Sequence, residues 1–221
     1  MAKRKGRKLR GAELKAHALE VLARLEREYP NARTELDFET PLQLLIATIL
    51  SAQCTDKRVN MVTPELFRTF PSARDLACAE VERLEEMIRS TGFFRNKTKS
   101  LLGMSAAIVE RHAGEVPRTM AELVLLPGVG RKTANVVLGN ALGVSEGVVV
   151  DTHIGRLSIR LGFTNETDPV KVEQVLMRLI PREDWVKIAH LLIFHGRRVC
   201  VARAPRCGDC VLNDICPSSR V

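Results

Sequence analysis

Aromatic residues are scarce in this 221-residue chain, which has only seven Phe, one Trp and one Tyr. A surface that binds nucleic acid through rows of stacked aromatic side chains is therefore not expected. Long apolar runs are missing as well, because the densest, residues 42–50, is interrupted by Gln43 and Thr48. A membrane-spanning helix needs about 20 consecutive apolar residues, so the sequence predicts none and no membrane partner.

Acidic residues are absent from the first ten positions. Those positions hold six basic residues, which supply +6 of the formal net charge of +8, and residues 11–221 carry only +2. We expect residues 1–10 to form a flexible basic tail that contacts phosphates; the alternative is a solubilising tail without a binding role. Glu13 and Glu20 interrupt the apolar stretch that a secretion signal would need. A cytoplasmic, nucleoid-associated protein is therefore expected.

Strand patterns are nearly absent, since Val148–Val150 is the only strand-like run. Apolar residues instead recur at helical spacing, and the sequence predicts about ten helices joined by short loops, an all-α fold. Helix N-caps are expected at Thr40, Asp56, Ser72, Asn96, Thr119, Asp151 and Asp168.

Residues 126–134 (LPGVGRKTA) place two glycines just before a basic segment. Glycines let the backbone turn sharply, and the free amides in the first turn of the next helix attract an anion together with the helix dipole. A plain helix-turn-helix connector is the alternative. The full string favours phosphate binding by Gly128, Gly130, Arg131 and Thr133, a contact that carries no sequence information.

Lys132 lies in the first turn of the helix expected after those glycines. The helix dipole disfavours a charged ammonium there, partial burial would act in the same way, and a neutral amine is a nucleophile. Asp151 is expected to cap a later helix, directly before Thr152 and His153. Spacing alone favours a phosphate-contacting lysine and a simple cap over catalysis.

Four of the six cysteines lie in the last 22 residues. Structural zinc sites usually pair their thiols as two short knuckles, whereas here a single C-x2-C motif has gaps of six and five residues on either side. This spacing favours a compact loop around a [4Fe-4S] cluster, with zinc as the alternative. The expected ligands are Cys200, Cys207, Cys210 and Cys216.

Other residues with metal-ligating or basic side chains are less informative. Arg203 and Arg206 lie close to the ligands and are expected to offset thiolate charge and contact DNA phosphates, or else to be solvated. Cys54 and Cys78 stand apart from the cluster loop and are expected to be core or half-buried residues. The histidines show no spacing typical of a metal site.

Together, these motifs resemble the endonuclease III family of DNA glycosylases and AP lyases. The string at residues 126–134 is similar to that family's helix-hairpin-helix motif, and residues 149–153 (VVDTH) are similar to its acidic segment. The cysteine spacing matches the family's cluster loop gap for gap. The resemblance extends over residues 11–217.

The resemblance implies a two-domain helix-hairpin-helix DNA glycosylase fold. Residues 34–145 would form a six-helix domain with the hairpin. Residues 11–33 and 146–221 would form a discontinuous iron–sulfur cluster domain, with residues 1–10 as the basic tail. Lys132 and Asp151 would then face each other across the cleft between the domains.

The resemblance also implies DNA contacts outside the three motifs. Gln53, in residues 51–56 (SAQCTD), matches the residue that fills the gap left by the base. Phe93, in residues 91–97 (TGFFRNK), matches the wedge in the opposite strand, where an aliphatic residue is expected; Phe94 is the alternative wedge. His153 is expected to contact DNA. Val124 stands where some relatives have an acid near the pocket.

The implied function is that of a bifunctional enzyme of base excision repair. It would bind double-stranded DNA as a monomer, flip a damaged nucleotide out and remove oxidised pyrimidines. Lys132 would attack C1′ to give a Schiff base, and β-elimination would cut 3′ of the abasic site. Asp151 would deprotonate Lys132 or stabilise the positive charge on the sugar.

Two other functions stay open. A monofunctional mismatch glycosylase would use water as the nucleophile, but such relatives lack a lysine at the hairpin position, so Lys132 argues against it. A non-enzymatic DNA-binding or redox-sensing iron–sulfur protein would need the hairpin and the cluster. It would not need Lys132 and Asp151 together.

Overall fold

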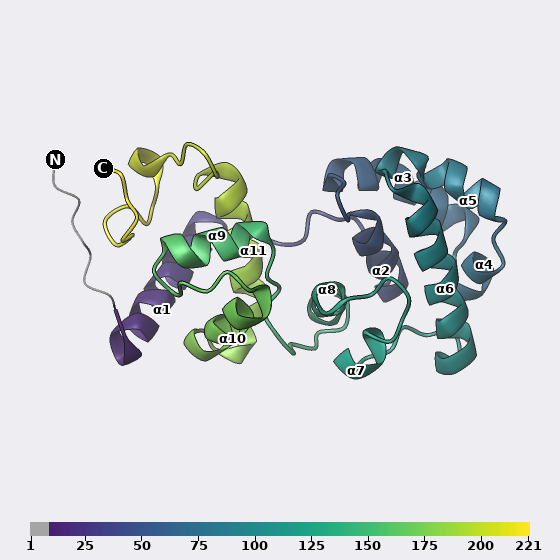
Figure 1. Ribbon diagram of the computed structural model, residues 1–221, viewed down its shortest axis with the longest axis horizontal. Helices are drawn as coiled ribbons and strands as arrows, with labels where there is room; N and C mark the ends of the chain where they lie inside the picture. The colour runs from purple at the N-terminus through teal and green to yellow at the C-terminus, as the bar shows by residue number, and fades with distance from the viewer. Residues whose placement is uncertain (1–8) are drawn as a thin grey trace. The chain divides into compact units, whose positions relative to one another are not determined.

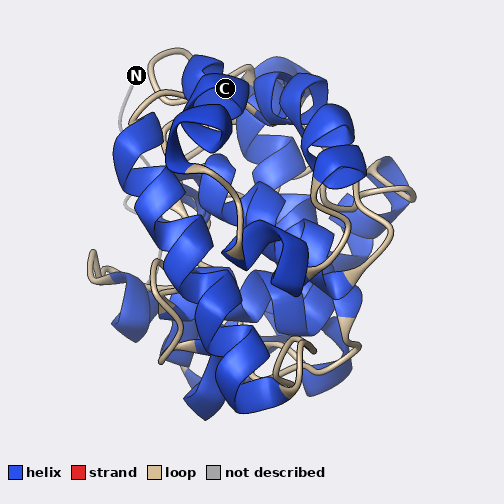
Figure 2. Ribbon diagram, turned by 90° about the vertical axis from the view of Figure 1, so that its right-hand side faces the viewer, coloured by secondary structure: helices blue, strands red, loops and turns tan. Residues whose placement is uncertain are grey.

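The computed structural model describes residues 9–221, and every regular element in that range is a helix (Figure 2). The all-α class predicted from the sequence is thereby confirmed. The basic tail falls mostly on residues 1–8, outside the described range. The α-helices are α1 (Gly11–Glu28), α2 (Pro41–Leu50), α3 (Asp56–Thr69), α4 (Ala73–Ala77), α5 (Val81–Ile88), α6 (Phe94–His112), α7 (Met120–Leu123), α8 (Arg131–Ala141), α9 (Thr152–Arg160), α10 (Pro169–Leu179) and α11 (Trp185–Arg198). Three short 3-10 helices are η1 (Arg89–Thr91), η2 (Arg182–Asp184) and η3 (Cys207–Asp209).

Five of the seven expected helix caps are observed. The side chains of Thr40, Ser72, Thr119, Asp151 and Asp168 each accept a backbone N–H in the first turn of the following helix.

Three local expectations are wrong. Asp56 is the first residue of α3, because Thr55 is the cap and its side chain accepts from Arg58 N. Asn96 lies inside α6, since the chain enters that helix through a left-handed residue, Phe93, that needs no side-chain cap. Cys78, expected to be a core or half-buried residue, is exposed, because it follows the short helix α4 at the surface.

The chain divides into two compact units, each with its own core. The unit formed by Thr34–Glu146 contains α2 to α8, of which α4 and α7 are only five and four residues long. Helix α2 is apolar nearly all round and packs against α3, α6 and α8. A helix of that composition must be buried, so α2 forms the centre of this unit.

The second unit joins α1 to Gly147–Val221, which contains α9, α10 and α11. Helix α11 packs against α9 and α1, and the core lies among them. The C-terminal segment, yellow in Figure 1, is mostly irregular and is anchored by the fully buried Leu212. No helix within residues 9–221 has the length and apolar character needed to cross a membrane.

Candidate functional site

The turn before α8 owes its shape to Gly128. Its φ is +75°, a conformation that side chains disfavour, and a Cβ added there would lie 2.5 Å from the Cβ of Ser100 in α6. Gly130 differs, because its φ of −91° suits any residue and its Cβ would meet nothing within 4 Å. The expectation that both glycines serve the turn is therefore right for Gly128 only. At Gly130, the missing side chain leaves open space in front of α8.

The first turn of α8 contains Arg131, Lys132 and Thr133. Gly130 is the N-cap and offers no side chain to accept the first amides of the helix, which have no acceptor within it. The side chain of Lys132 is exposed.

Asp151 lies in the other unit, at the N-terminus of α9. Its Oδ1 accepts the N–H of Ile154 at 2.8 Å, so it is a helix cap, as the sequence predicts, and the side chain is half-buried. Because Lys132 and Asp151 belong to separate units, their opposition across a cleft stays a prediction. His153, two residues further on, contacts Arg156, with 3.2 Å between Nδ1 and Nη2.

Gln53 and Phe93 share an unusual backbone conformation and are both exposed. Their φ angles are +54° and +48°, and the only other non-glycine residue with positive φ in residues 9–221 is Ala113, at the end of α6. Such a conformation costs ~1–3 kcal/mol, and residues that adopt it cluster at active sites and ligand-binding segments. The Phe93 side chain is 62% exposed. Phe94 is half-buried, and its ring lies under the guanidinium of Arg95 at 5.6 Å.

The four clustered cysteines line one cavity of about 210 Å³. All four are free thiols, and the Sγ atoms of Cys200 and Cys210 each lie 3.3 Å from a side-chain nitrogen, Arg160 Nη1 and His195 Nε2 respectively. Burial raises the pKa of the Cys210 and Cys216 thiols. Binding of metal at these two residues therefore releases protons. Four thiols around one cavity suit the ligand chemistry of an iron–sulfur cluster.

His195 is a residue of this cavity that the sequence does not reveal. It is only 2% exposed, and burial lowers its pKa to about 4. Its Nδ1 lies 3.1 Å from the hydroxyl oxygen of Tyr29, and its Nε2 contacts Cys210. Neither contact follows a sequence spacing, because Tyr29 belongs to the end of α1 and Cys210 to the C-terminal loop.

Arginines hold the cysteine segment against α9. Arg160 donates to the carbonyls of Val201 at 2.8 Å and Ala202 at 2.7 Å. Arg156 donates to the Cys200 carbonyl at 3.1 Å. In the sequence, the only sign that these two arginines act together is their spacing of four residues, which places them on one face of α9.

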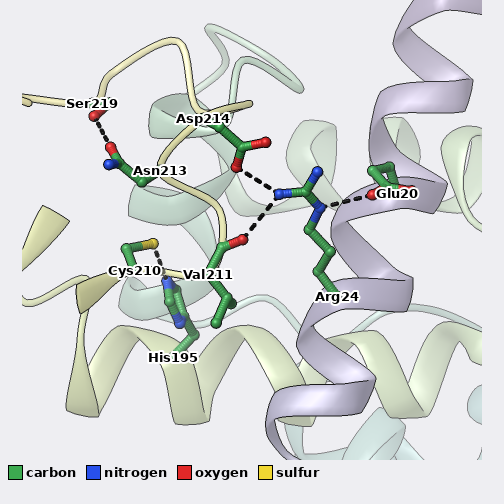
Figure 3. A network of polar contacts seen from close by, with 8 residues as sticks. All are labelled: Glu20, Arg24, His195, Cys210, Val211, Asn213, Asp214 and Ser219. Carbon is green, nitrogen blue, oxygen red and sulfur yellow. Dashed lines mark hydrogen bonds and ion pairs between the residues drawn. The ribbon is translucent and has the colours of Figure 1, made fainter. Parts of the chain in front are cut away.

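A third arginine, Arg24 in α1, anchors the far side of the same loop (Figure 3). Its guanidinium donates to the Val211 carbonyl at 3.2 Å and to Asp214 at 2.5 Å. Asp214 and Glu20 raise the pKa of Arg24 through these hydrogen-bonded ion pairs. The C-terminal loop is thus tied to α1 as well as to α9.

The two arginines expected near the ligands differ in their contacts. The guanidinium of Arg206 donates to the Arg198 carbonyl at the end of α11, and its backbone N–H donates to Val199 O at 3.0 Å. Arg203 is exposed. Contact of either with DNA stays a prediction.

Comparison with known proteins defines both the class and the family. Residues 46–182 match the HhH-GPD superfamily of base excision DNA repair proteins, and residues 200–216 match the iron–sulfur binding domain of endonuclease III. The chain is 55% identical over 209 residues to an endonuclease III of Synechocystis sp., and the match covers 95% of each of the two chains. It is 48% identical over 189 residues to an endonuclease III of Bacillus subtilis, and that match covers 85% of this chain and 86% of the other protein. It is similar to the solved structure of a trapped endonuclease III–DNA covalent intermediate, with a TM-score of 0.88, 43% identity and coverage of 92% of this chain and 96% of that one.

The chain therefore belongs to the HhH-GPD superfamily of base excision DNA repair proteins and, within it, to the endonuclease III family. The resemblance and the function expected from the sequence are confirmed at this level. The protein is a DNA glycosylase and AP lyase of base excision repair that binds DNA, and its cofactor is a [4Fe-4S] cluster.

Proposed function

We propose that this enzyme removes oxidised pyrimidines from duplex DNA and then cuts the strand 3′ of the abasic site. The observation that carries the proposal is Lys132, an exposed amine in the first turn of α8, directly after the hairpin. A protein 43% identical to this chain has been trapped as a covalent intermediate with DNA. A covalent enzyme–DNA bond requires a nucleophile, and Lys132 is the residue that we assign to this role.

The hairpin is proposed to bind a phosphate of the DNA backbone. The open space at Gly130 lets a phosphate approach the first amides of α8, which have no acceptor in the helix. Arg131 and Thr133 would add contacts from the same turn. These contacts position the enzyme without reading sequence, as a repair enzyme that finds damage anywhere requires.

The reaction begins when a damaged nucleotide is flipped out of the duplex, at a cost of a few kcal/mol that is lower for a poorly stacked base. The Lys132 amine attacks C1′, the bond from C1′ to the base breaks, and the base leaves with a proton. The bond between C1′ and O4′ then breaks, the one remaining amine proton moves to O4′, and a C1′=N imine is left. Removal of a C2′ proton then expels the 3′ phosphate and cuts the strand.

Asp151 is proposed to act on the same step, either by accepting a proton from Lys132 or by stabilising the positive charge that develops on the sugar. This role requires that the hairpin domain, residues 34–145, and the iron–sulfur cluster domain, residues 11–33 and 146–221, bind DNA between them. A damaged duplex would be bound by one copy of the chain, in the cytoplasm.

Gln53, Phe93 and His153 are proposed to complete the DNA interface. Gln53 would fill the gap left by the flipped base, and Phe93 would wedge the opposite strand. Exposure of the Phe93 ring and burial of much of Phe94 favour Phe93 over Phe94 as the wedge. Arg203 is a further candidate for phosphate contact. The guanidinium of Arg206 already donates to the Arg198 carbonyl at the end of α11.

The cluster ligands are proposed to be Cys200, Cys207, Cys210 and Cys216, whose thiols line one cavity. When bound, the cluster supplies four iron–thiolate bonds that organise residues 200–216. The loop has little regular structure of its own, so these bonds and the arginine contacts determine its shape.

Replacing Cys207 with serine is expected to remove the visible absorption of the cluster and most of the iron, and to lower solubility, because metal binding and folding of the loop are coupled. Cys78→Ser is the matched control, since Cys78 is exposed and lies outside the loop. Iron analysis and absorption spectra of protein purified without oxygen measure the effect. One zinc and no iron per chain in the wild type would contradict the assignment.

Duplexes with an oxidised pyrimidine, an abasic site or no lesion test the proposed function directly. We expect release of the oxidised base and a strand cut without added alkali, and no reaction of the undamaged duplex. A monofunctional enzyme would release the base and leave the strand intact until alkali is added. A non-enzymatic DNA-binding protein would do neither.

Phe93→Ala is expected to slow release of a damaged base by roughly tenfold or more, because the wedge offsets the cost of unstacking. Cutting at a preformed abasic site needs less unstacking and should lose much less. Single-turnover rates on the two duplexes measure the difference, and Phe94→Ala serves as the comparison variant. Equal losses on both duplexes would mean that Phe93 does not act as a wedge.

A further inference from the structure

Lys97 in α6 is the only buried lysine within residues 9–221, and it is 5% exposed. Its Nζ donates to two backbone carbonyls, Leu50 O at 2.7 Å and Thr91 O at 2.9 Å. Burial lowers the pKa of Lys97, and the nearby Cys54 opposes this effect. Burying an ammonium is costly, whereas an apolar side chain would fill the same space without that cost. Packing alone therefore does not explain a lysine here.

The two carbonyls that Lys97 contacts each end a helix. Leu50 is the last residue of α2, and Thr91 is the last residue of η1. Carbonyls at helix C-termini lack donors within the helix and carry the negative end of its dipole, so they attract a cation. The ammonium of Lys97 thus joins the ends of two elements that are far apart in the sequence.

Directly after each of these carbonyls, the chain enters a turn with a strained, exposed residue. Gln53 follows Leu50 by three positions, and Phe93 follows Thr91 by two. The backbone N–H of Lys97 also donates to Phe93 O at 3.1 Å. Left-handed residues of this size persist only where surrounding contacts hold them. Lys97 supplies such contacts to both turns.

We propose that Lys97 is a positioning residue for base extrusion, whose ammonium clamps the turn of Gln53 to the turn of Phe93 so that both side chains enter the duplex in register. The inference rests on the proposed function, in which these two side chains enter DNA. It adds a residue that does not itself touch DNA and sets the spacing of those that do.

The test compares single-turnover rates on a duplex with an oxidised pyrimidine and on one with a preformed abasic site. Lys97→Met keeps the length and apolar stem but removes the donors. It is expected to lose 10- to 100-fold on the damaged base, the order of loss for misplaced contacts, and much less on the abasic site. A fluorescent adenine analogue opposite the lesion should show weaker unstacking in this variant.

The matched control is Lys99→Met, which removes the same charge from an exposed position two residues further along α6. It should leave the ratio of the two rates unchanged. The double variant Lys97→Met, Phe93→Ala adds a measurement, the extra rate loss caused by Phe93→Ala, that a general loss of stability would not change. If Lys97 acts by positioning the wedge, Phe93→Ala should cost little more once Lys97 is Met, because coupled residues are not additive.

Equal losses of Lys97→Met on both duplexes, or a full additional cost of Phe93→Ala in the Lys97→Met background, would overturn the inference. Lys97→Gln, which keeps an uncharged NH2 group as donor, is expected to fold and to give an intermediate loss. Thermal unfolding monitors both variants, and failure of both to fold would also overturn a positioning role. A wild type that releases no base would instead overturn the proposed function, and the inference with it.

Discussion

Lys132→Gln is expected to abolish both strand cutting and the covalent protein–DNA adduct that borohydride traps in the wild type. Glutamine has no nucleophilic amine, so no imine forms at C1′ and there is nothing to reduce. Binding to an abasic-site duplex should largely survive, because the phosphate contacts of the hairpin come from the backbone amides of α8. Denaturing gels of the reduced reactions measure the adduct, and gel-shift titration measures binding.

Lys99→Gln is the control for the loss of one positive charge, since Lys99 is exposed in the same unit. Both variants should change the slope of log K against log salt by no more than about one unit, the contribution of one phosphate contact. An adduct formed by Lys132→Gln at wild-type yield would assign the nucleophile to another residue. A wild type that releases bases without forming any adduct would favour a water-using glycosylase.

Asp151→Asn is expected to lower the rate of base release on the order of 10²-fold or more, in the range of a lost general base. The variant should remain folded, because asparagine caps a helix about as well as aspartate and can still accept the N–H of Ile154. DNA binding should also persist. The measurements are single-turnover rates, thermal unfolding and binding, all on the same preparation.

The matched control is Asp168→Asn, in which another capping aspartate, at the start of α10, is replaced in the same way. Asp168→Asn should leave the rate of base release unchanged. A rate that is lower for Asp151→Asn than for Asp168→Asn therefore results from the missing charge and not from a weaker helix cap. A dependence of rate on pH separates the two roles of Asp151. Loss of a base makes the rate rise with pH across the measured range, whereas loss of a stabilising charge lowers it at every pH.

Local patterns in the sequence determined much of the fold. Helical periodicity and capping side chains act within a few residues, so they can be recognised without tertiary structure. The same holds for the cysteine spacing and for the hairpin string. The expected caps at Asp56 and Asn96 are wrong by one and three residues, and the errors arose where a neighbouring threonine or a left-handed residue began the helix instead.

Contacts between distant residues were decided only by the tertiary structure. Nothing near Gly128 in the sequence indicates that its missing Cβ makes room for Ser100. In the sequence, Lys97 resembles an ordinary surface lysine. Only the structure shows that its ammonium donates a hydrogen bond to the carbonyl of Leu50, 47 residues earlier.

For the cysteine loop as well, the sequence determined some features and the tertiary structure determined others. The spacing of four thiols along a short segment determined which residues can bind iron, because ligand chemistry depends on residue type and reach. The contacts of Arg160 with Cys200, 40 residues away, and of His195 with Cys210 depend on how α9 and α11 pack. Packing of helices brings together side chains that no spacing rule relates, so only the folded chain could reveal which groups surround the sulfur atoms.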